Sequence, residues 1–146
     1  IRQIVDRRAG AQRAVDDTEG VSLETMPTPA ATVADGRATG EAIAARLSGD
    51  RPDAVFAAND LLAMGVLQGL ARHGIRVPEE IAIIGFDDIE FAAAAVVPLS
   101  SVRQPSQLMG ETALRILVEE IANVDSPAQQ VVFDPELVVR ASTSPR

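Results

Sequence analysis

Two pairs of polar residues each follow an apolar run that is typical of a buried strand. Asn59 and Asp60 come directly after "DAVFAA", and Asp87 and Asp88 come directly after "IAIIGF". A carboxylate accepts hydrogen bonds from hydroxyl and amine groups, and an amide both donates and accepts. If the two runs are parallel strands, both pairs lie at the carboxyl edge of one sheet, where open α/β folds bind ligands. This edge is therefore the candidate binding site.

Each pair also has a purely structural interpretation. An Asn at the start of a helix caps it by accepting from an N–H of the first turn, which is worth about 1 kcal/mol. On position alone, this cap is the favoured interpretation of Asn59. Asp87 and Asp88 fit a turn or a cap before the next helical segment. Two such pairs on one edge shift the balance toward a cleft, with Asp60 and Asp88 assigned capping or structural roles.

Strand and helix patterns alternate between residues 21 and 86. Because the runs at 54–58 and 81–86 are apolar throughout, they indicate parallel strands that are covered on both faces. The predicted fold class is therefore α/β, with a parallel sheet flanked by helices. Helices are expected over 6–16, 36–49, 59–74 and 105–124, strands over 20–26, 52–58 and 81–86, an extended piece over 99–105, and two short strands within 129–142.

Two helix ends carry their own signals. Gly74 stands where a helix-ending glycine belongs, after Arg72 and His73 in the last turn. Ser106 or Gln104 is expected to cap the last long helix. That helix carries an apolar stripe of Leu108, Ala113, Leu114, Leu117 and Ile121.

Composition excludes several classes of function. The 146 residues suit one domain, and 47% of them are hydrophobic, which excludes a disordered chain. The formal net charge of −8 makes this chain alone a poor binder of nucleic acid. With no Cys and one His, no metal cluster and no cofactor is expected. No membrane span or signal peptide is read in the sequence, so the expected location is the cytoplasm.

Four phrases of the sequence, taken in order, resemble the effector-binding core of the LacI/GalR family of bacterial transcription regulators. They are "PDAVFAANDLLAMG", "GIRVPEEIAIIGFDD", "PLSSVRQP" and "GETALRIL", with Leu-Ser-Ser-Val replacing the usual Leu-Thr-Thr-Val. The resemblance is strong over about 51–120 and extends more weakly through "DRRAG" and "GRATGEAIAARL". It implies two α/β lobes of the periplasmic-binding-protein-like type, hinged over a cleft for a small effector, usually a sugar or nucleobase.

The resemblance also assigns ligand-binding residues. Arg7 matches the family's cleft arginine, Asn59 its amide ligand and Asp87 its principal carboxylate. Without the resemblance, Arg7 would be interpreted as a solvated helix residue. Asp35 stands where the family often has an aromatic platform, which argues against sugar-ring stacking at this point, with Val33 as a weak apolar substitute.

The resemblance divides the chain into three parts. Residues 1–103 correspond to an N-terminally truncated C-terminal effector-binding subdomain, 104–128 to a helix of the N-terminal subdomain, and 129–146 to return strands and tail of the C-terminal subdomain. The family's helix-turn-helix and most of its first lobe have no counterpart here. We therefore expect a C-terminal piece of a longer regulator, in which the apolar stripe of the last helix has lost the sheet it would cover.

A homodimer is the expected assembly, since family members dimerise through the second lobe. Matching positions are Met64, Gln68, Arg72, Phe91, Ala94 and Ala95. The first three are spaced i, i+4 and i+8, so they share a helical face. The alternative is that Phe91 and Met64 fill the core. DNA is expected to be contacted only through the missing N-terminal domain.

The predicted function is that of the ligand-sensing and dimerisation core of a LacI-type regulator, with a small polar effector that is expected to be a sugar. One alternative is a periplasmic-type sugar-binding protein, which shares the two-lobed architecture. Another is an enzyme in which Asp87 and Asp88 hold a metal or act as an acid/base pair, but no nucleophile–base arrangement is visible. A third is a dimerisation module with a vestigial cleft.

Overall fold

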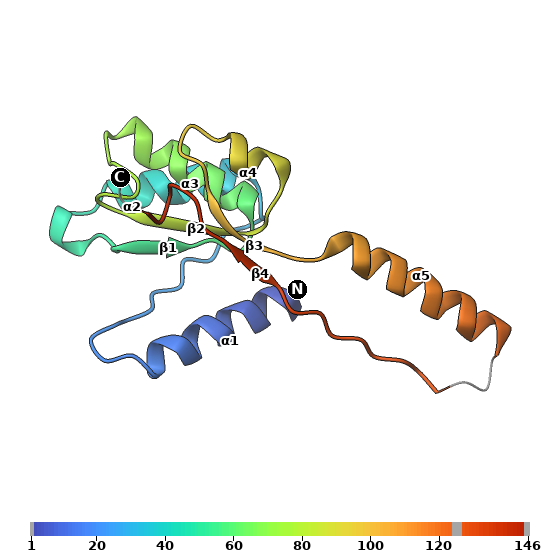
Figure 1. Cartoon of the computed structure of the whole chain (residues 1–146). Helices are drawn as coiled ribbons and strands as arrows, with labels where there is room; N and C mark the ends of the chain where they lie inside the picture. Colours follow the sequence, from blue (N-terminus) through green and yellow to red (C-terminus); the bar gives the residue numbers. More distant parts are fainter. Residues whose placement is uncertain (1, 124–126, 145–146) are drawn as a thin grey trace.

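A four-stranded sheet organises the chain, as the computed structural model of residues 2–123 and 127–144 shows (Figure 1). Its strands follow the order β1 (Ala54–Phe56), β2 (Ala82–Asp87), β3 (Ser100–Arg103) and β4 (Glu136–Val138). The first three strands are parallel, and β4 runs antiparallel to β3. The α/β prediction is therefore confirmed, with one antiparallel edge strand that makes the sheet mixed.

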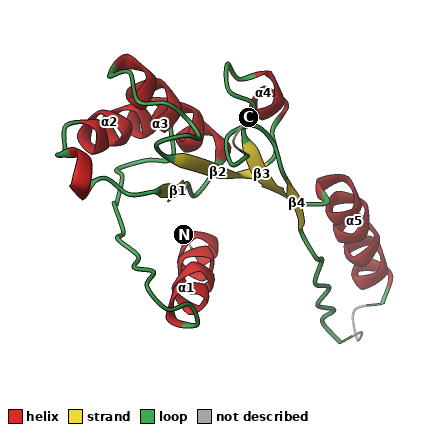
Figure 2. Cartoon of the chain, turned by 60° about the vertical axis from the view of Figure 1, so that its left-hand side comes forward, coloured by secondary structure: helices red, strands yellow, loops and turns green. Residues whose placement is uncertain are grey.

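Helices lie on both sides of this sheet and beyond its edge. The long helices are α1 (Arg2–Asp16), α2 (Val33–Ala44), α3 (Asp60–Arg72) and α5 (Ser106–Ala122), joined by the short α4 (Glu90–Ala94) and the 3-10 turn Ser48–Asp50. Figures 1 and 2 show α2, α3 and α4 over one face, α1 beside the other face, and α5 projecting away from the body. The first helix begins at Arg2 rather than at residue 6, and Ile1 lies outside the described residues.

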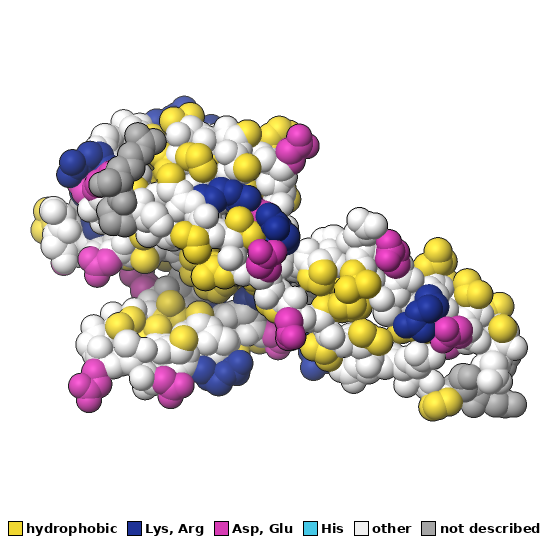
Figure 3. Space-filling view, in the orientation of Figure 1, with side chains coloured by type: hydrophobic (Ala, Val, Ile, Leu, Met, Phe, Trp, Pro, Cys, Tyr) yellow, Lys and Arg dark blue, Asp and Glu magenta, His cyan; other side chains and the backbone are white. Residues whose placement is uncertain are grey.

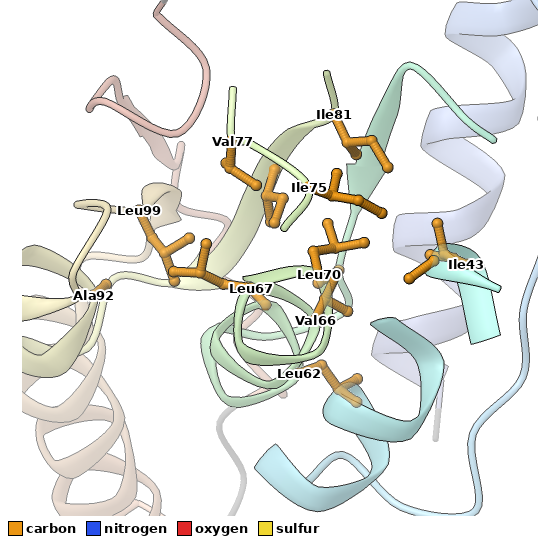
Figure 4. Close-up of a cluster of buried hydrophobic side chains, with 14 residues drawn as sticks. Ile43, Leu62, Val66, Leu67, Leu70, Ile75, Val77, Ile81, Ala92 and Leu99 are labelled. Carbon is orange, nitrogen blue, oxygen red and sulfur yellow. The ribbon is translucent and has the colours of Figure 1, made fainter. Parts of the chain in front are cut away.

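The core lies between the sheet and the helices α2 and α3. Ile83 at the centre of β2 is fully buried, and Ile43, Val66 and Leu70 from the two helices are at most 2% exposed (Figure 4). The opposite face is different, because Phe86 there is only half-buried and α1 has no buried residue. The prediction that both faces are fully covered is therefore wrong for the face next to α1.

Four glycines set the distance between α2 and α3. Gly36 and Gly40 on one helix, and Gly65 and Gly69 on the other, are each four residues apart and therefore share a helical face. A Cβ at Gly40 would lie 2.5 Å from the carbonyl oxygen of Val66, and one at Gly69 would lie 2.6 Å from that of Arg37. The helices consequently touch through their backbones, as small-residue pairs allow.

Several predicted elements differ from the structure. Residues 20–26 form no strand, and β1 pairs only with β2, so this segment finds no neighbour for its backbone hydrogen bonds. Of the two strands expected in 129–142, only β4 forms among the described residues. The second helix begins at Val33 rather than 36, because the Thr32 hydroxyl caps it by accepting from the Asp35 amide at 3.2 Å.

The predictions for the helix ends had mixed outcomes. Gly74 follows α3 with a φ of 73°, a left-handed conformation that suits glycine, so the helix-ending role is confirmed. The prediction that Ser106 or Gln104 caps α5 is wrong, because the N-cap is Pro105, which makes no side-chain hydrogen bond. The Ser106 hydroxyl instead donates to the Gln104 carbonyl at 3.3 Å.

Candidate functional site

Arg7 of α1 reaches across to the carboxyl edge of the sheet. Its guanidinium lies 3.5 Å from the centre of the Phe86 ring, and its Nη1 donates to the Ala58 carbonyl oxygen at 2.6 Å. Its Nη2 lies 3.7 Å from Oδ1 of Asp87. The side chain is only 15% exposed, so the interpretation of Arg7 as a solvated residue is wrong. The structure brings together the arginine and the carboxylate that the resemblance selected.

Asp87 is the open carboxylate of this edge. Its side chain is 37% exposed, and its Oδ1 accepts a hydrogen bond from Nε2 of Gln104 at 2.8 Å. Sequence reasoning missed Gln104 as a site residue. The signal was present, because Gln104 follows β3 in the same way that Asn59 follows β1, and parallel strands end at one edge.

Asn59 acts as the helix cap at this edge. Its Oδ1 accepts from the Leu62 amide at 2.9 Å, and its Nδ2 donates to the Ala31 carbonyl at 3.3 Å. The capping interpretation is therefore confirmed. The residue also lies next to Ala58, whose carbonyl holds Arg7, so it belongs to the same edge. Its oxygen is less free to meet a ligand than the carboxylate of Asp87.

Asp88 is a buried ion-pair partner rather than a cap. Its side chain is 4% exposed and accepts from Arg103 Nε at 2.7 Å and from Arg140 Nη1 at 2.6 Å. The hydrogen bond from Arg140, helped by that from Arg103, lowers the pKa of this carboxyl. The N-cap of α4 is Ile89, without a side-chain bond. The capping role expected for Asp88 is therefore wrong, and its structural role is correct.

Asp60 is the fully buried carboxylate beneath the edge. It accepts from the Ser101 hydroxyl at 2.7 Å and from the Ile89 amide at 2.8 Å. Desolvation raises its pKa, although both hydrogen bonds act in the opposite direction. The structural interpretation of Asp60 is confirmed.

Asp35, at the position where the family often has an aromatic platform, lies in the first turn of α2. The Asp35 carboxylate accepts from the hydroxyl of Thr32, so it serves the first turn of α2. Neither Asp35 nor the half-buried Val33 presents a ring to the edge. Arg7 already covers the nearby ring of Phe86.

The edge is formed by four residues that are each half-buried, Arg7, Asn59, Asp87 and Gln104. Two grooves in the described part of the chain lie elsewhere, one of about 290 Å³ beside Ile75 and Val97 and one of about 530 Å³ beside Met26 and Ala42. Within residues 2–123 and 127–144, no cluster of three potential metal ligands is found. The arrangement can accept hydrogen bonds at Asp87 and donate them from Arg7 and Gln104, which suits a polyhydroxylated ligand.

The positions assigned to a dimer interface are largely at the surface. Phe91 is 64% exposed, so it does not fill the core as the alternative proposed. Gln68, Arg72 and Ala94 are also exposed, while Met64 and Ala95 are half-buried and pack against the core. Arg72 pairs with Glu41 of α2 at 3.0 Å. The interface itself stays a prediction.

The apolar stripe of α5 faces solvent in this chain. Leu108, Leu114, Leu117 and Ile121 are between 51% and 71% exposed, and no residue of the helix is buried. Figure 3 shows hydrophobic side chains over this arm of the molecule. The predicted exposure of the stripe is therefore confirmed. Among the described residues, no helix is long and apolar enough to cross a membrane.

Comparisons with known proteins show the family of this chain. The sequence profile of the periplasmic binding protein-like domain family matches residues 2–143. The HTH-type transcriptional regulator MalR of Streptomyces coelicolor is 37% identical over 139 residues, which are 92% of this chain and 40% of MalR. The HTH-type transcriptional repressor PurR of Mannheimia succiniciproducens is 39% identical over 93 residues, 64% of this chain and 28% of PurR. The chain thus spans well under half the length of these relatives.

Solved structures give the same result. A putative LacI-family transcriptional regulator from Sanguibacter keddieii has a TM-score of 0.84 at 30% identity, with 94% of this chain and 52% of that one covered. The complex of the transcriptional regulator CelR with cellobiose has a TM-score of 0.69 at 39% identity, covering 76% and 33%. A LacI-family regulator from Lactobacillus casei with bound sucrose has a TM-score of 0.68 at 34% identity, covering 76% and 40%.

Proposed function

We propose a function from one premise: the chain belongs to the periplasmic binding protein-like domain family, and within it to the effector-binding cores of LacI/GalR-type transcriptional regulators. The proposed function is to sense a small polar effector, which alters DNA binding by a helix-turn-helix domain outside this chain. The observation that carries it is the meeting of Arg7, Asp87 and Gln104 at the carboxyl edge of the sheet. Because the chain spans only 40% of MalR and 28% of PurR, the proposal is made for a longer protein that contains it.

A carbohydrate is the proposed effector class. An exposed carboxylate beside an arginine and an amide can accept from and donate to vicinal hydroxyls. CelR was solved with cellobiose and the L. casei regulator with sucrose, which supports the same class for this chain. The edge supplies one wall of the cleft in this proposal, so we expect the 146-residue chain to bind weakly or not at all by itself.

A homodimer acting in the cytoplasm completes the proposal. The surface would consist of Met64, Gln68, Arg72, Phe91, Ala94 and Ala95. The net charge of −8 and the names of the relatives both support contact with DNA through another domain rather than through this chain.

The other candidate functions are less well supported. A periplasmic-type sugar-binding protein shares the architecture, but MalR and PurR are named transcriptional regulators. The same names argue against an enzyme. In addition, Asp88 is tied to two arginines, which opposes a catalytic pair with Asp87.

Calorimetric titration tests the proposal. The longer protein that contains this chain is titrated with a panel of mono- and disaccharides and nucleobases, and operator binding is then measured with and without any ligand found. Saturable binding of one sugar that also changes DNA affinity is the expected result. If the protein binds no compound of the panel, or if its affinity for DNA is the same with and without the ligand, it is not the sensor proposed here.

A further inference from the structure

The turn after β2 has an unusual backbone conformation. Asp87 has a φ of 102° and Asp88 a φ of 53°, and within the described residues they are the only non-glycine residues with a positive φ. Side chains disfavour this region, so such residues persist only where the surrounding structure holds them. The question is what holds this turn, since it aims the open carboxylate of Asp87.

Two buried side chains from other elements bind the backbone of this turn. The Asp88 amide donates to the Ser101 hydroxyl at 3.0 Å, and the next amide, that of Ile89, donates to Oδ2 of Asp60 at 2.8 Å. The Ser101 hydroxyl in turn donates to Oδ1 of Asp60 at 2.7 Å. Both consecutive amides after Asp87 are thus held by one connected pair, Asp60 and Ser101.

The pair is fully enclosed by the fold. Asp60 at the start of α3 and Ser101 in β3 are each 0% exposed. Gly85 of β2 lies against them, and a Cβ at this position would collide with Oδ1 of Asp60. The carboxylate therefore has no direct access to a ligand, and each of its oxygens accepts one hydrogen bond.

We infer that Asp60 and Ser101 are positioning residues for the Asp87 carboxylate, because they hold the left-handed turn that presents it at the sheet edge. This inference rests on the proposed function for its consequence, which is effector affinity. The positioning role itself does not depend on that function, since the hydrogen bonds from the Asp88 and Ile89 amides are made without a ligand. Neither residue touches the ligand in this proposal.

The variant Ser101→Ala tests the inference most directly. It removes the acceptor of the Asp88 amide and the donor to Asp60, whereas Ser101→Thr keeps the hydroxyl. Ser142→Ala is the matched control. Ser142 is equally buried, accepts from the Ser100 amide at 2.8 Å and donates to the Ile83 carbonyl at 2.6 Å, but makes no bond to the turn.

Amide hydrogen exchange of the 146-residue chain, read by NMR, needs no ligand. In Ser101→Ala we expect the Asp88 amide to exchange at least about tenfold faster relative to amides of α3, and the Asp87 HN–Hα coupling to change. Ser101→Thr should restore both values, and Ser142→Ala should leave both unchanged. Asp60→Asn, a weaker neutral acceptor, should raise exchange at Ile89 several-fold.

The second measurement uses the longer protein with cellobiose, glucose and sucrose as probes. We expect Ser101→Ala to weaken binding of whichever sugar binds by about tenfold, with Ser101→Thr and Ser142→Ala within twofold of the unmodified protein. If none of the sugars binds the unmodified protein, the proposed sugar-sensing function loses support, while the exchange data still decide the positioning role. Unchanged exchange and coupling in Ser101→Ala overturn the inference, and unchanged Ile89 exchange in Asp60→Asn removes Asp60 from it.

Discussion

Asp87 is the residue on which the proposed site depends most. Its carboxylate is the open acceptor beside Arg7, and a ligand that donates to it loses a charge-assisted contact when the side chain is shortened. Truncating one partner of such a desolvated contact typically costs about 2–5 kcal/mol. We therefore expect Asp87→Ala to weaken effector binding tens-fold or more in the longer protein, as measured by calorimetry. Asp134→Ala, at an exposed acid in the segment before β4, serves as the control. Equal affinity in Asp87→Ala and the unmodified protein would place the effector elsewhere.

The stability of the chain at acid pH tests the ion pairs that Asp88 makes with Arg103 and Arg140. Because Arg140 and Arg103 hold its folded-state pKa below the usual value of about 3.9, its contribution is fully present above about pH 4. That contribution is lost as the pH falls through the lowered folded-state pKa. Asp60 acts in the opposite direction, because burial raises its pKa and its protonation favours the folded chain.

Urea unfolding between pH 3 and pH 7 checks this expectation. Asp88→Asn should lower the free energy of unfolding at pH 7 by about 1.5–3 kcal/mol, the usual worth of hydrogen bonds to charged groups. Below about pH 4 the difference from the unmodified chain should shrink. A difference that stays constant across the whole range would show that the ionised form of Asp88 contributes nothing to stability.

Sequence reasoning reached some of these residues and not others, for physical reasons. The rule that parallel strands end at one edge placed both polar pairs there, and the resemblance then selected Asn59 and Asp87 from them. The same rule also applied to Gln104, where it was not used. Arg7 was reached only through the resemblance, since its guanidinium bonds a carbonyl 51 residues away. The arginine partners of Asp88 lie 15 and 52 residues away in the sequence, so the residues around Asp88 do not predict them.

At the scale of elements, the close contact between α2 and α3 depends on glycines, which have no Cβ to separate the two helices. A Cβ at Gly65 would lie 2.6 Å from the Arg37 nitrogen and 2.8 Å from the Gly36 carbonyl carbon, which are backbone atoms that cannot rotate away. Gly65→Ala should therefore lower the free energy of unfolding by about 1–3 kcal/mol or more, as overpacking does. The measurement is the urea midpoint of the chain.

Gly110→Ala is the matched control for Gly65→Ala. Gly110 also lies in a helix, α5, but apart from its chain neighbours and the backbone of that helix nothing lies within 4 Å of its would-be Cβ. Alanine there should stabilise the helix by up to about 1 kcal/mol. If both variants lose the same stability, close packing of α2 on α3 is not the cause.

The elements themselves were largely predictable, and the failures have a common cause. α3 and β2 were predicted nearly to their ends, because their apolar patterns coincide with tertiary burial. The segment 20–26 has a strand pattern but no neighbouring strand, and a strand needs one for its backbone groups. Glycines four residues apart in both α2 and α3 also indicate close helix packing, although this was not predicted.

At the scale of the molecule, assembly is the next test. Phe91 is a large apolar residue that is 64% exposed, and exposed apolar surface often marks an interaction site. If this face forms the proposed homodimer, Phe91→Asp should convert the longer protein from dimer to monomer in sedimentation velocity experiments. Leu47→Asp, at an apolar residue after α2 that is 77% exposed, should leave the dimer intact. A dimer that survives Phe91→Asp at micromolar concentration would exclude this face.

The backbone contact between α2 and α3 also has a genetic consequence for the whole chain. Every change of a glycine codon that is neither silent nor a stop replaces glycine with a residue that carries a Cβ. At Gly36, Gly40, Gly65 and Gly69 that atom meets the backbone of the opposite helix. A single-nucleotide mutation at any of these four codons that changes the encoded residue therefore forces the two helices apart, whichever base is altered.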